Sequence, residues 1–192
     1  MNKIKIAISG IGAVGGYYGG LLAARYKDSE EIDIYFISRG ENLKKIREND
    51  GIEVKNSFLT IKAKPTLATD NPAEIGPVDY LFCCTKSYDL EKNIAQLAPM
   101  IGPKTVIIPL QNGVDIAERI QPLLPNNEIW KGCVYINSRL VRPGRVEKFT
   151  IKDRMFFGSK QGNKIRQKEL QEILANARIL TTIPDDIDLE IW

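Results

Sequence analysis

The chain has 192 residues, of which 43% are hydrophobic and 27% charged, and its formal net charge is +3. This composition is typical of a folded globular protein, and so mild and dispersed a positive charge does not indicate a nucleic-acid partner. No apolar run approaches the roughly 18 residues of a membrane span, and the N-terminus lacks the long apolar stretch of a signal peptide. We therefore expect a cytoplasmic protein with neither nucleic acid nor membrane as partner.

The chain contains no histidine and three cysteines, Cys83, Cys84 and Cys133. A histidine-based catalytic dyad within it is therefore impossible, and no Cys-x-x-Cys pair indicates a metal site. Cys83 and Cys84 are adjacent in an apolar run, so in a strand their side chains would point to opposite faces. We expect buried, reduced thiols and no bound metal.

The first elements form a βαβ unit: a strand over 4–9, a helix over 14–26 and a strand over 32–38, with a glycine-rich turn after the first strand. A short polar helix over 41–49 follows. Residues 52–54 and 58–63 then have the pattern of a β-hairpin, with Asn56-Ser57 at its turn.

The middle of the chain alternates buried strands with helices, and shorter strands of mixed character follow Trp130. We expect strands over 78–85 and 105–110, helices over 90–97 and 114–120, then strands over 133–137, 145–149, 155–157 and 179–183 and helices over 164–175 and from 185. The alternation predicts an α/β fold with a doubly wound, mostly parallel, Rossmann-type sheet and a few mixed or antiparallel strands toward the C-terminus.

The turn after the first strand matches G-x-G-x-x-G, and it runs Gly10, Ile11, Gly12, Ala13, Val14, Gly15. The motif lies in the context that it needs, between a strand and a helix of a βαβ unit. Gly10 permits the tight turn, Gly12 lets the backbone approach a pyrophosphate, and Gly15 lets the helix pack closely on the strand. The N–H groups of the helix N-terminus then face the phosphates, which predicts a dinucleotide cofactor.

The end of the second strand indicates which dinucleotide binds. NAD-specific domains place an acidic residue there for the ribose hydroxyls, whereas this chain has Ser38 and Arg39. A guanidinium is suited to a 2′-phosphate, and a serine hydroxyl adds a further contact. We therefore predict NADP(H) as the cofactor, although Glu41 would offset part of the positive charge.

Two polar residues follow the next strands of the predicted sheet, Lys86 after 78–85 and Asn112 after 105–110. The carboxyl ends of parallel strands meet at the edge where open α/β sheets bind their ligands. Lys86 suits a cofactor phosphate or a substrate carboxylate, and the amide of Asn112 suits a nicotinamide, a ribose or a substrate carbonyl. A surface lysine and a turn asparagine before Gly113 are the alternative interpretations.

Together, Gly10 to Gly15, Ser38-Arg39, Cys84-Thr85-Lys86 and Gln111-Asn112-Gly113 resemble the ketopantoate reductases. The segment from Gly132 to Gly144 and the closing Leu-Glu-Ile-Trp are also similar to that family. The resemblance implies NADPH-dependent reduction of a keto acid, 2-dehydropantoate, to (R)-pantoate on the route to pantothenate and coenzyme A. It also implies a cleft between an N-terminal NADP-binding domain and a C-terminal helical domain.

The resemblance also assigns residues. Arg39 would contact the 2′-phosphate, Lys86 and Asn112 both cofactor and substrate, and Asn137 the cofactor. Residues 1–184 would form the NADP-binding domain, and 185–192 the start of the helix that leads into the helical domain. The family's catalytic lysine comes just after a tryptophan that Trp192 resembles. We therefore expect no catalytic residue in this chain, negligible reductase activity from it alone, and oligomer contacts through the absent domain.

Two other functions fit the same pattern. A polyol, opine or glycerol-phosphate dehydrogenase also joins a Rossmann domain to a helical one, but several of these prefer NAD and would place an acid where Arg39 stands. A non-catalytic NADP sensor would bind the cofactor without oxidising it. Fold alone does not decide among them.

Overall fold

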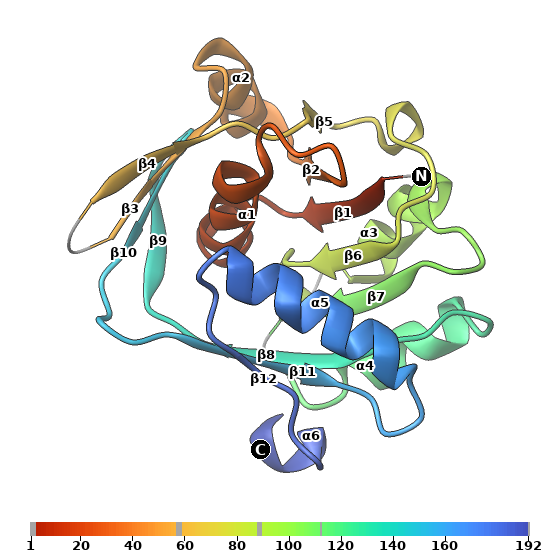
Figure 1. Ribbon diagram of the computed structural model, residues 1–192. Helices are drawn as coiled ribbons and strands as arrows, with labels where there is room; N and C mark the ends of the chain where they lie inside the picture. Colours follow the sequence, from red (N-terminus) through yellow and green to blue (C-terminus); the bar gives the residue numbers. More distant parts are fainter. Residues whose placement is uncertain (1–2, 57–58, 88–89, 112, 192) are drawn as a thin grey trace.

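The computed structural model describes residues 3–56, 59–87, 90–111 and 113–191. At its centre is a parallel sheet with the strand order β5-β2-β1-β6-β7 (Figure 1). Its strands are β1 (Ile4–Ser9), β2 (Ile32–Ile37), β5 (Leu67–Thr69), β6 (Tyr80–Cys83) and β7 (Val106–Pro109). Because the chain winds outward from β1 in both directions, the sheet is doubly wound, as the sequence predicts.

Helices cover both faces of this sheet. They are α1 (Ala13–Tyr26) and α5 (Lys164–Asn176) on one face, and α3 (Leu90–Leu97) and α4 (Ile116–Ile120) on the other. Phe82 packs in the core with α1 and α5, whereas its neighbour Cys83 packs with α3 and α4. Cys84 returns to the first face, which confirms that the two adjacent cysteines point in opposite directions. Burial on both sides explains the continuous apolar runs of these strands.

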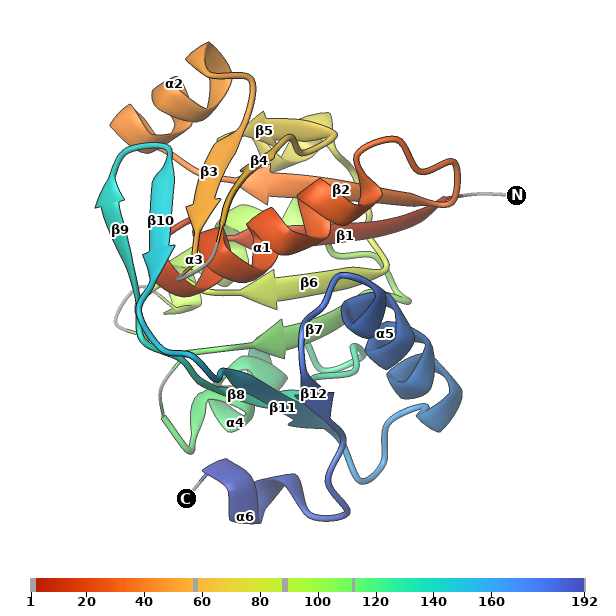
Figure 2. The same cartoon turned by 60° about the vertical axis from the view of Figure 1, so that its left-hand side comes forward.

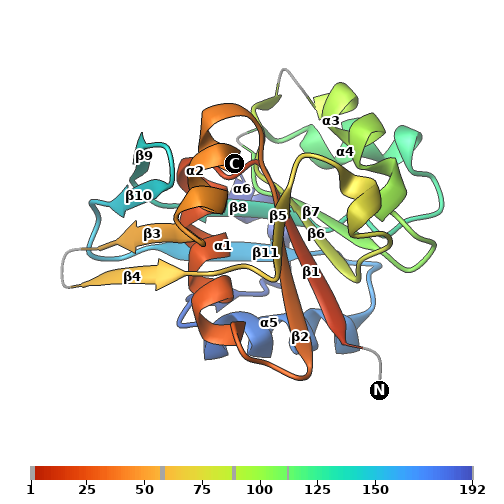
Figure 3. The same ribbon diagram turned by 90° about the horizontal axis from the view of Figure 1, so that it is seen from above.

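A second sheet, in the order β4-β3-β10-β9, closes over the outer side of α1. Its strands are β3 (Ile52–Lys55), β4 (Thr60–Ala63), β9 (Ser138–Arg142) and β10 (Arg145–Lys148). Figure 3 shows α1 between this sheet and strands β1 and β2. A Cβ on Gly16 would lie 2.6 Å from Val146 Cγ2, and one on Gly20 would lie 2.2 Å from Val54 Cγ2. The paired glycines of α1 therefore let the two sheets enclose the helix, which is why it is apolar on nearly every side.

The third sheet has the order β12-β11-β8 and continues from the edge of the central sheet. It consists of β8 (Lys131–Tyr135), β11 (Arg154–Gly158) and β12 (Thr181–Thr182). The Trp130 N–H donates to the carbonyl of Ile107 at 2.9 Å, so the chain that enters β8 runs parallel to β7. The remaining helices are α2 (Gly40–Glu48) and α6 (Ile187–Ile191), with short 3₁₀ turns η1 (Pro72–Glu74), η3 (Ala98–Met100) and η4 (Gln121–Leu123).

The structure departs from the sequence expectations at short, exposed or polar elements. Strands β5 and β9 were not expected, since β5 has three residues with an alanine at its centre and β9 carries two arginines. The strand expected over 179–183 spans only Thr181–Thr182, and the helix expected from Val114 begins at Ile116. Within the described part of the chain, no helix has both the length and the apolar character of a membrane span.

Candidate functional site

The carboxyl ends of β1, β6 and β7 lie at one edge of the central sheet, toward the left in Figure 2. The glycine-rich loop leaves this edge after β1, the segment that contains Lys86 leaves it after β6, and Gln111 follows β7. The winding of the chain reverses between β1 and β6, and doubly wound sheets bind their ligands at that point. The candidate site is therefore built around the loop from Gly10 to Gly15.

Two glycines of this loop are required by the protein itself. Gly10 has φ +90°, and a Cβ there would lie 2.8 Å from the backbone nitrogen of Thr85. A Cβ on Gly15 would lie 2.2 Å from the carbonyl oxygen of Gly10. Both contacts are far shorter than a Cβ tolerates, so these glycines fix how closely α1 approaches β1 and β6.

Gly12 has no such requirement. A Cβ built on it would meet no atom of the described residues within 4 Å, and its backbone has φ −97° and ψ −142°. Gly12 therefore borders open space at the N-terminus of α1. Packing against the described residues therefore does not explain a glycine here, whereas close approach by a ligand does.

The N-terminus of α1 suits an anionic ligand. No side chain caps it, and its first turn, which includes Ala13 and Val14, contains no acidic residue. The N–H groups of this turn and the positive end of the helix dipole therefore face the space beside Gly12. Ile11, which precedes the helix, is 3% exposed and anchors the loop in the core. This combination fits the pyrophosphate of a dinucleotide.

Ser38 and Arg39 lie next to the loop because β2 is the neighbour of β1. The Gly10 N–H donates to the carbonyl of Ile37 at 3.0 Å, and the Ser38 N–H donates to that of Thr69 at 3.0 Å. Ser38 is 7% exposed, while Arg39 is exposed at the N-cap of α2. The structure thus brings a buried hydroxyl and an exposed guanidinium beside the glycine-rich loop. Glu41, noted as a competing charge, lies 4.0 Å from Lys44.

Asn42 is a residue of this region that the sequence patterns did not identify. Its amide nitrogen lies 2.6 Å from the carbonyl oxygen of Ile11 and 3.3 Å from Ser38 Oγ. Its amide oxygen accepts a hydrogen bond from the Gly144 N–H at 2.8 Å. An asparagine in a polar helix is ordinary, so only the three-dimensional contacts reveal that it joins the loop to the end of β2.

A chain of buried polar side chains lies under the same edge of the sheet. Gln111 Nε2 donates to Thr85 Oγ1 at 3.2 Å, and this hydroxyl donates to Asn93 Oδ1 at 3.3 Å. Asn93 Nδ2 donates to Ser9 Oγ at 3.1 Å. These bonds join the ends of β1, β6 and β7 through α3. They hold in place the residues that directly precede Lys86 and position 112.

The other expected site residues follow β6, β7 and β8. Lys86 is exposed after β6, and Asn137 is exposed after β8, where its carbonyl accepts a hydrogen bond from the Phe149 N–H at 2.8 Å. Asn112 and Trp192 lie outside the described residues. The backbone contacts of Gly10 therefore bring both Ser38-Arg39, which follow Ile37, and Lys86, which follows Thr85, next to the glycine-rich loop, whereas no contact of this kind is seen for Asn137 among the described residues.

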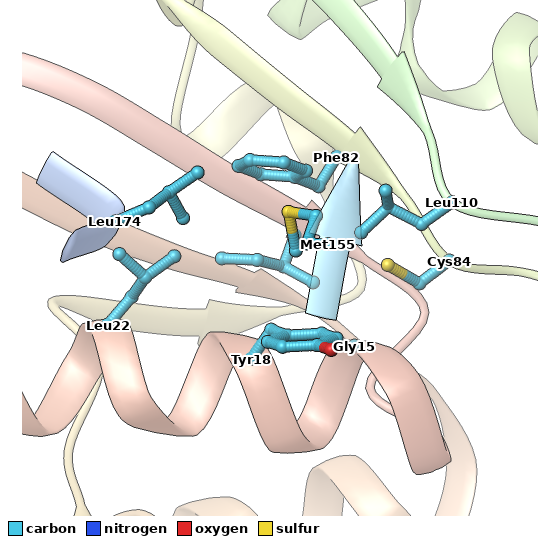
Figure 4. A pocket seen from close by; sticks show the side chains of 9 residues that line it. Gly15, Tyr18, Leu22, Phe82, Cys84, Leu110, Met155 and Leu174 are labelled. Carbon is cyan, nitrogen blue, oxygen red and sulfur yellow. The ribbon is translucent and has the colours of Figure 1, made fainter. Parts of the chain in front are cut away.

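A small cavity lies behind the loop, in the core between α1 and the central sheet (Figure 4). Tyr18, Cys84, Leu110 and Met155 surround it, and its volume is about 10 Å³. Burial raises the pKa of the Cys84 thiol well above its ordinary value. A space of this size accommodates about one water molecule, so it is a packing gap and not the binding site.

Comparison with known proteins agrees with this geometry. A family model described as "Ketopantoate reductase PanE/ApbA" matches residues 6–162. The crystal structure of a 2-dehydropantoate 2-reductase from Porphyromonas gingivalis W83 is 43% identical, with a TM-score of 0.94, over 99% of this chain and 67% of that one. These matches confirm the resemblance that the sequence motifs indicate.

Curated relatives are more distant and longer. A 2-dehydropantoate 2-reductase of Mesorhizobium japonicum is 28% identical over 98% of this chain and 62% of its own length. The Bacillus subtilis protein described as uncharacterized oxidoreductase YkpB is 25% identical over 98% of this chain and 60% of its own length. The chain therefore spans about 60% of the curated relatives that it matches.

A structure of D-mandelate dehydrogenase with NADH and anilino(oxo)acetate shares the fold, with a TM-score of 0.82 at 24% identity over 98% of this chain and 59% of that one. The same architecture thus occurs in a protein whose structure contains NADH. The choice between NADH and NADPH must come from individual residues of each chain.

Proposed function

Since the chain belongs to the ketopantoate reductase family PanE/ApbA, we propose that it is the NADP(H)-binding part of a 2-dehydropantoate 2-reductase. The open space at Gly12 carries the proposal, because a glycine that packing does not require lies where a dinucleotide needs one. Gly10, Ile11, Ala13, Val14 and Gly15 complete the loop that would hold the pyrophosphate.

Ser38 and Arg39 would select NADPH over NADH. Both lie at the end of β2, beside the glycine-rich loop, where an acidic residue would otherwise bind the ribose hydroxyls of NAD. The guanidinium offers paired donors to a 2′-phosphate, and the hydroxyl of Ser38 offers another. Glu41 does not oppose this arrangement strongly, since it is highly exposed and lies beside Lys44.

The reactive, nicotinamide end of the cofactor would be contacted by Lys86, Asn112 and Asn137. Lys86 and Asn112 would also contact the keto acid. The polar chain of Ser9, Asn93, Thr85 and Gln111 supports these roles, because it fixes the ends of β6 and β7 from which Lys86 and Asn112 follow. The cofactor supplies the hydride, and the residues of this chain orient it and form one wall of a cleft.

The division of the protein follows from the same resemblance. Residues 1–184 would be the NADP-binding domain and residues 185–192 the start of the helix that leads to a helical domain carrying the catalytic lysine. Helix α6 packs on the third sheet, where Lys131 lies 2.6 Å from Asp188 and the Tyr135 hydroxyl donates to the Glu190 carbonyl at 3.0 Å. Such contacts would hold the helix at the border of the cleft. The biological role would be the step from 2-dehydropantoate to (R)-pantoate, toward pantothenate and coenzyme A.

Two measurements on the 192-residue chain test the proposal. NADPH binding is followed by its fluorescence, and 2-dehydropantoate is then added while NADPH oxidation is followed by absorbance. We expect binding with negligible oxidation, and the homologous Porphyromonas gingivalis protein serves as the active reference. Failure to bind NADPH would contradict the cofactor assignment. A turnover within about tenfold of the reference would contradict the assignment of catalysis to residues outside this chain.

A further inference from the structure

We propose that Asn42 is a positioning residue that locks the glycine-rich loop to the end of β2 and strengthens the preference for a 2′-phosphorylated dinucleotide. The inference rests on the proposed function, because it concerns the cofactor site described there. Asn42 would contact no phosphate itself, but it fixes the glycine-rich loop at Ile11 and the Ser38 hydroxyl that would.

The orientation of the Asn42 amide is determined by its partners. The oxygen faces the Gly144 N–H at 2.8 Å, and the nitrogen faces the Ile11 carbonyl at 2.6 Å. Exchanging the two amide atoms would bring an oxygen against a carbonyl oxygen and an NH₂ group against an N–H. One side chain therefore joins the middle of the glycine-rich loop to the turn between β9 and β10.

The second donor of Asn42 acts on Ser38. It lies 3.3 Å from Ser38 Oγ, so the hydroxyl accepts a hydrogen bond from the amide. The hydrogen of that hydroxyl then remains available for another acceptor. A phosphate offers only acceptor oxygens, whereas a ribose 2′-hydroxyl both donates and accepts. Asn42 therefore prepares Ser38 as a donor, which favours NADPH more than NADH.

The Gly144 contact makes the arrangement rigid. Gly144 has φ +77°, and a Cβ on it would lie 3.4 Å from Lys45 Cβ and from Asn49 Nδ2. The turn between β9 and β10 is thus seated against the C-terminal half of α2 and its C-cap Asn49. Because hydrogen bonds fix both the oxygen and the nitrogen of the Asn42 amide, Ile11 and Ser38 have less freedom to move than they would beside an amide bonded to water.

The test compares Asn42→Ala with Asn126→Ala, which removes an exposed asparagine from the turn before β8. NADPH, NADH and 2′,5′-ADP are each titrated into the folded variants, and thermal unfolding is recorded in parallel. For Asn42→Ala we expect the Kd of NADPH and of 2′,5′-ADP to rise about tenfold and that of NADH about threefold or less. Asn126→Ala should leave all three values unchanged.

A second variant distinguishes a specific loss of NADPH binding from a general loss of folding. Asn42→Asp has the same shape and keeps an acceptor for Gly144, but it loses the donors and places a negative charge beside Ser38. We expect it to weaken NADPH binding more than Asn42→Ala does, with NADH affected less. An unchanged ratio of the NADPH and NADH dissociation constants in both variants, with tight NADPH binding by the unmodified chain, would overturn the inference alone. Absence of NADPH binding by the unmodified chain would overturn the proposed function, and this inference with it.

Discussion

The hydroxyl of Thr85 accepts a hydrogen bond from the side-chain amide of Gln111 at 3.2 Å and thereby joins the ends of β6 and β7. The same hydroxyl donates to Asn93 Oδ1 on α3 at 3.3 Å. Both partners are nearly buried, with exposed fractions of 8% for Gln111 and 9% for Asn93. Bonds in such surroundings cannot be replaced freely by water, so this threonine is a structural link under the candidate site.

Replacing Thr85 with valine keeps the shape of the side chain and removes both hydrogen bonds. We expect the free energy of unfolding to fall by about 1–3 kcal/mol, because a buried donor and a buried acceptor lose their partner. Urea unfolding provides the measurement, and Thr60→Val on the exposed strand β4 is the matched control. Equal effects of the two substitutions would show that the buried link contributes nothing.

The glycines at positions 12 and 15 should respond to alanine in opposite ways. Gly12→Ala should destabilise the fold less than Gly15→Ala, since its Cβ would meet no described atom within 4 Å, but it should weaken NADPH binding about tenfold or more. Gly15→Ala should destabilise the fold by about 1–3 kcal/mol, since its Cβ would lie 2.2 Å from the Gly10 carbonyl. Unchanged NADPH affinity in Gly12→Ala would remove the main support for a pyrophosphate at this loop.

Alkaline pH should weaken the fold through its buried thiols. Burial raises the pKa of Cys83 from 9.0 to about 12. The unfolded chain therefore loses this proton first, so the contribution of Cys83 to stability is complete below about pH 9 and declines as the pH rises toward 12. Unfolding free energies measured from pH 7 to 10 should fall above pH 9, with a shallower fall for Cys83→Ala. An identical pH dependence for that variant would contradict a buried, protonated Cys83.

Thiol labelling gives an independent check on the same cysteines. Cys133 is half-buried, whereas Cys83 is fully buried. At pH 8 a disulfide reagent should modify Cys133 well before Cys83, which should react only when the protein unfolds. Mass spectrometry of partly labelled protein identifies the site. Early modification of Cys83 would mean that the central sheet opens readily.

The sequence predicts those parts of the site whose residues are neighbours in the chain. Gly10 to Gly15 lie between a strand and a helix, and Arg39 directly follows the next strand, so local pattern alone indicates a βαβ unit with a phosphate-binding turn. The alternation of apolar strands with helices likewise predicts the doubly wound sheet, because burial on both faces leaves a continuous apolar run.

Local sequence patterns do not predict contacts between segments that are distant in the chain. Asn42 meets Gly144 across 102 positions, and Gln111 meets Thr85 across 26. Gln111 was noted only as the neighbour of Asn112, although its own amide forms the buried link. The sequence does not predict strand β9 for a different reason. Arg139 and Arg142 give this strand the composition of a loop, as is common at a sheet edge.

The most direct test of the central claim is calorimetric titration of NADPH and NADH into the unmodified chain and into Arg39→Ala. Lys168→Ala, which removes the same charge from the exposed side of α5, is the control. We expect that NADPH binds more tightly than NADH, that Arg39→Ala abolishes the difference, and that Lys168→Ala preserves it. Equal or tighter binding of NADH by the unmodified chain would contradict the assignment of Arg39 to the 2′-phosphate and of NADP(H) as the cofactor.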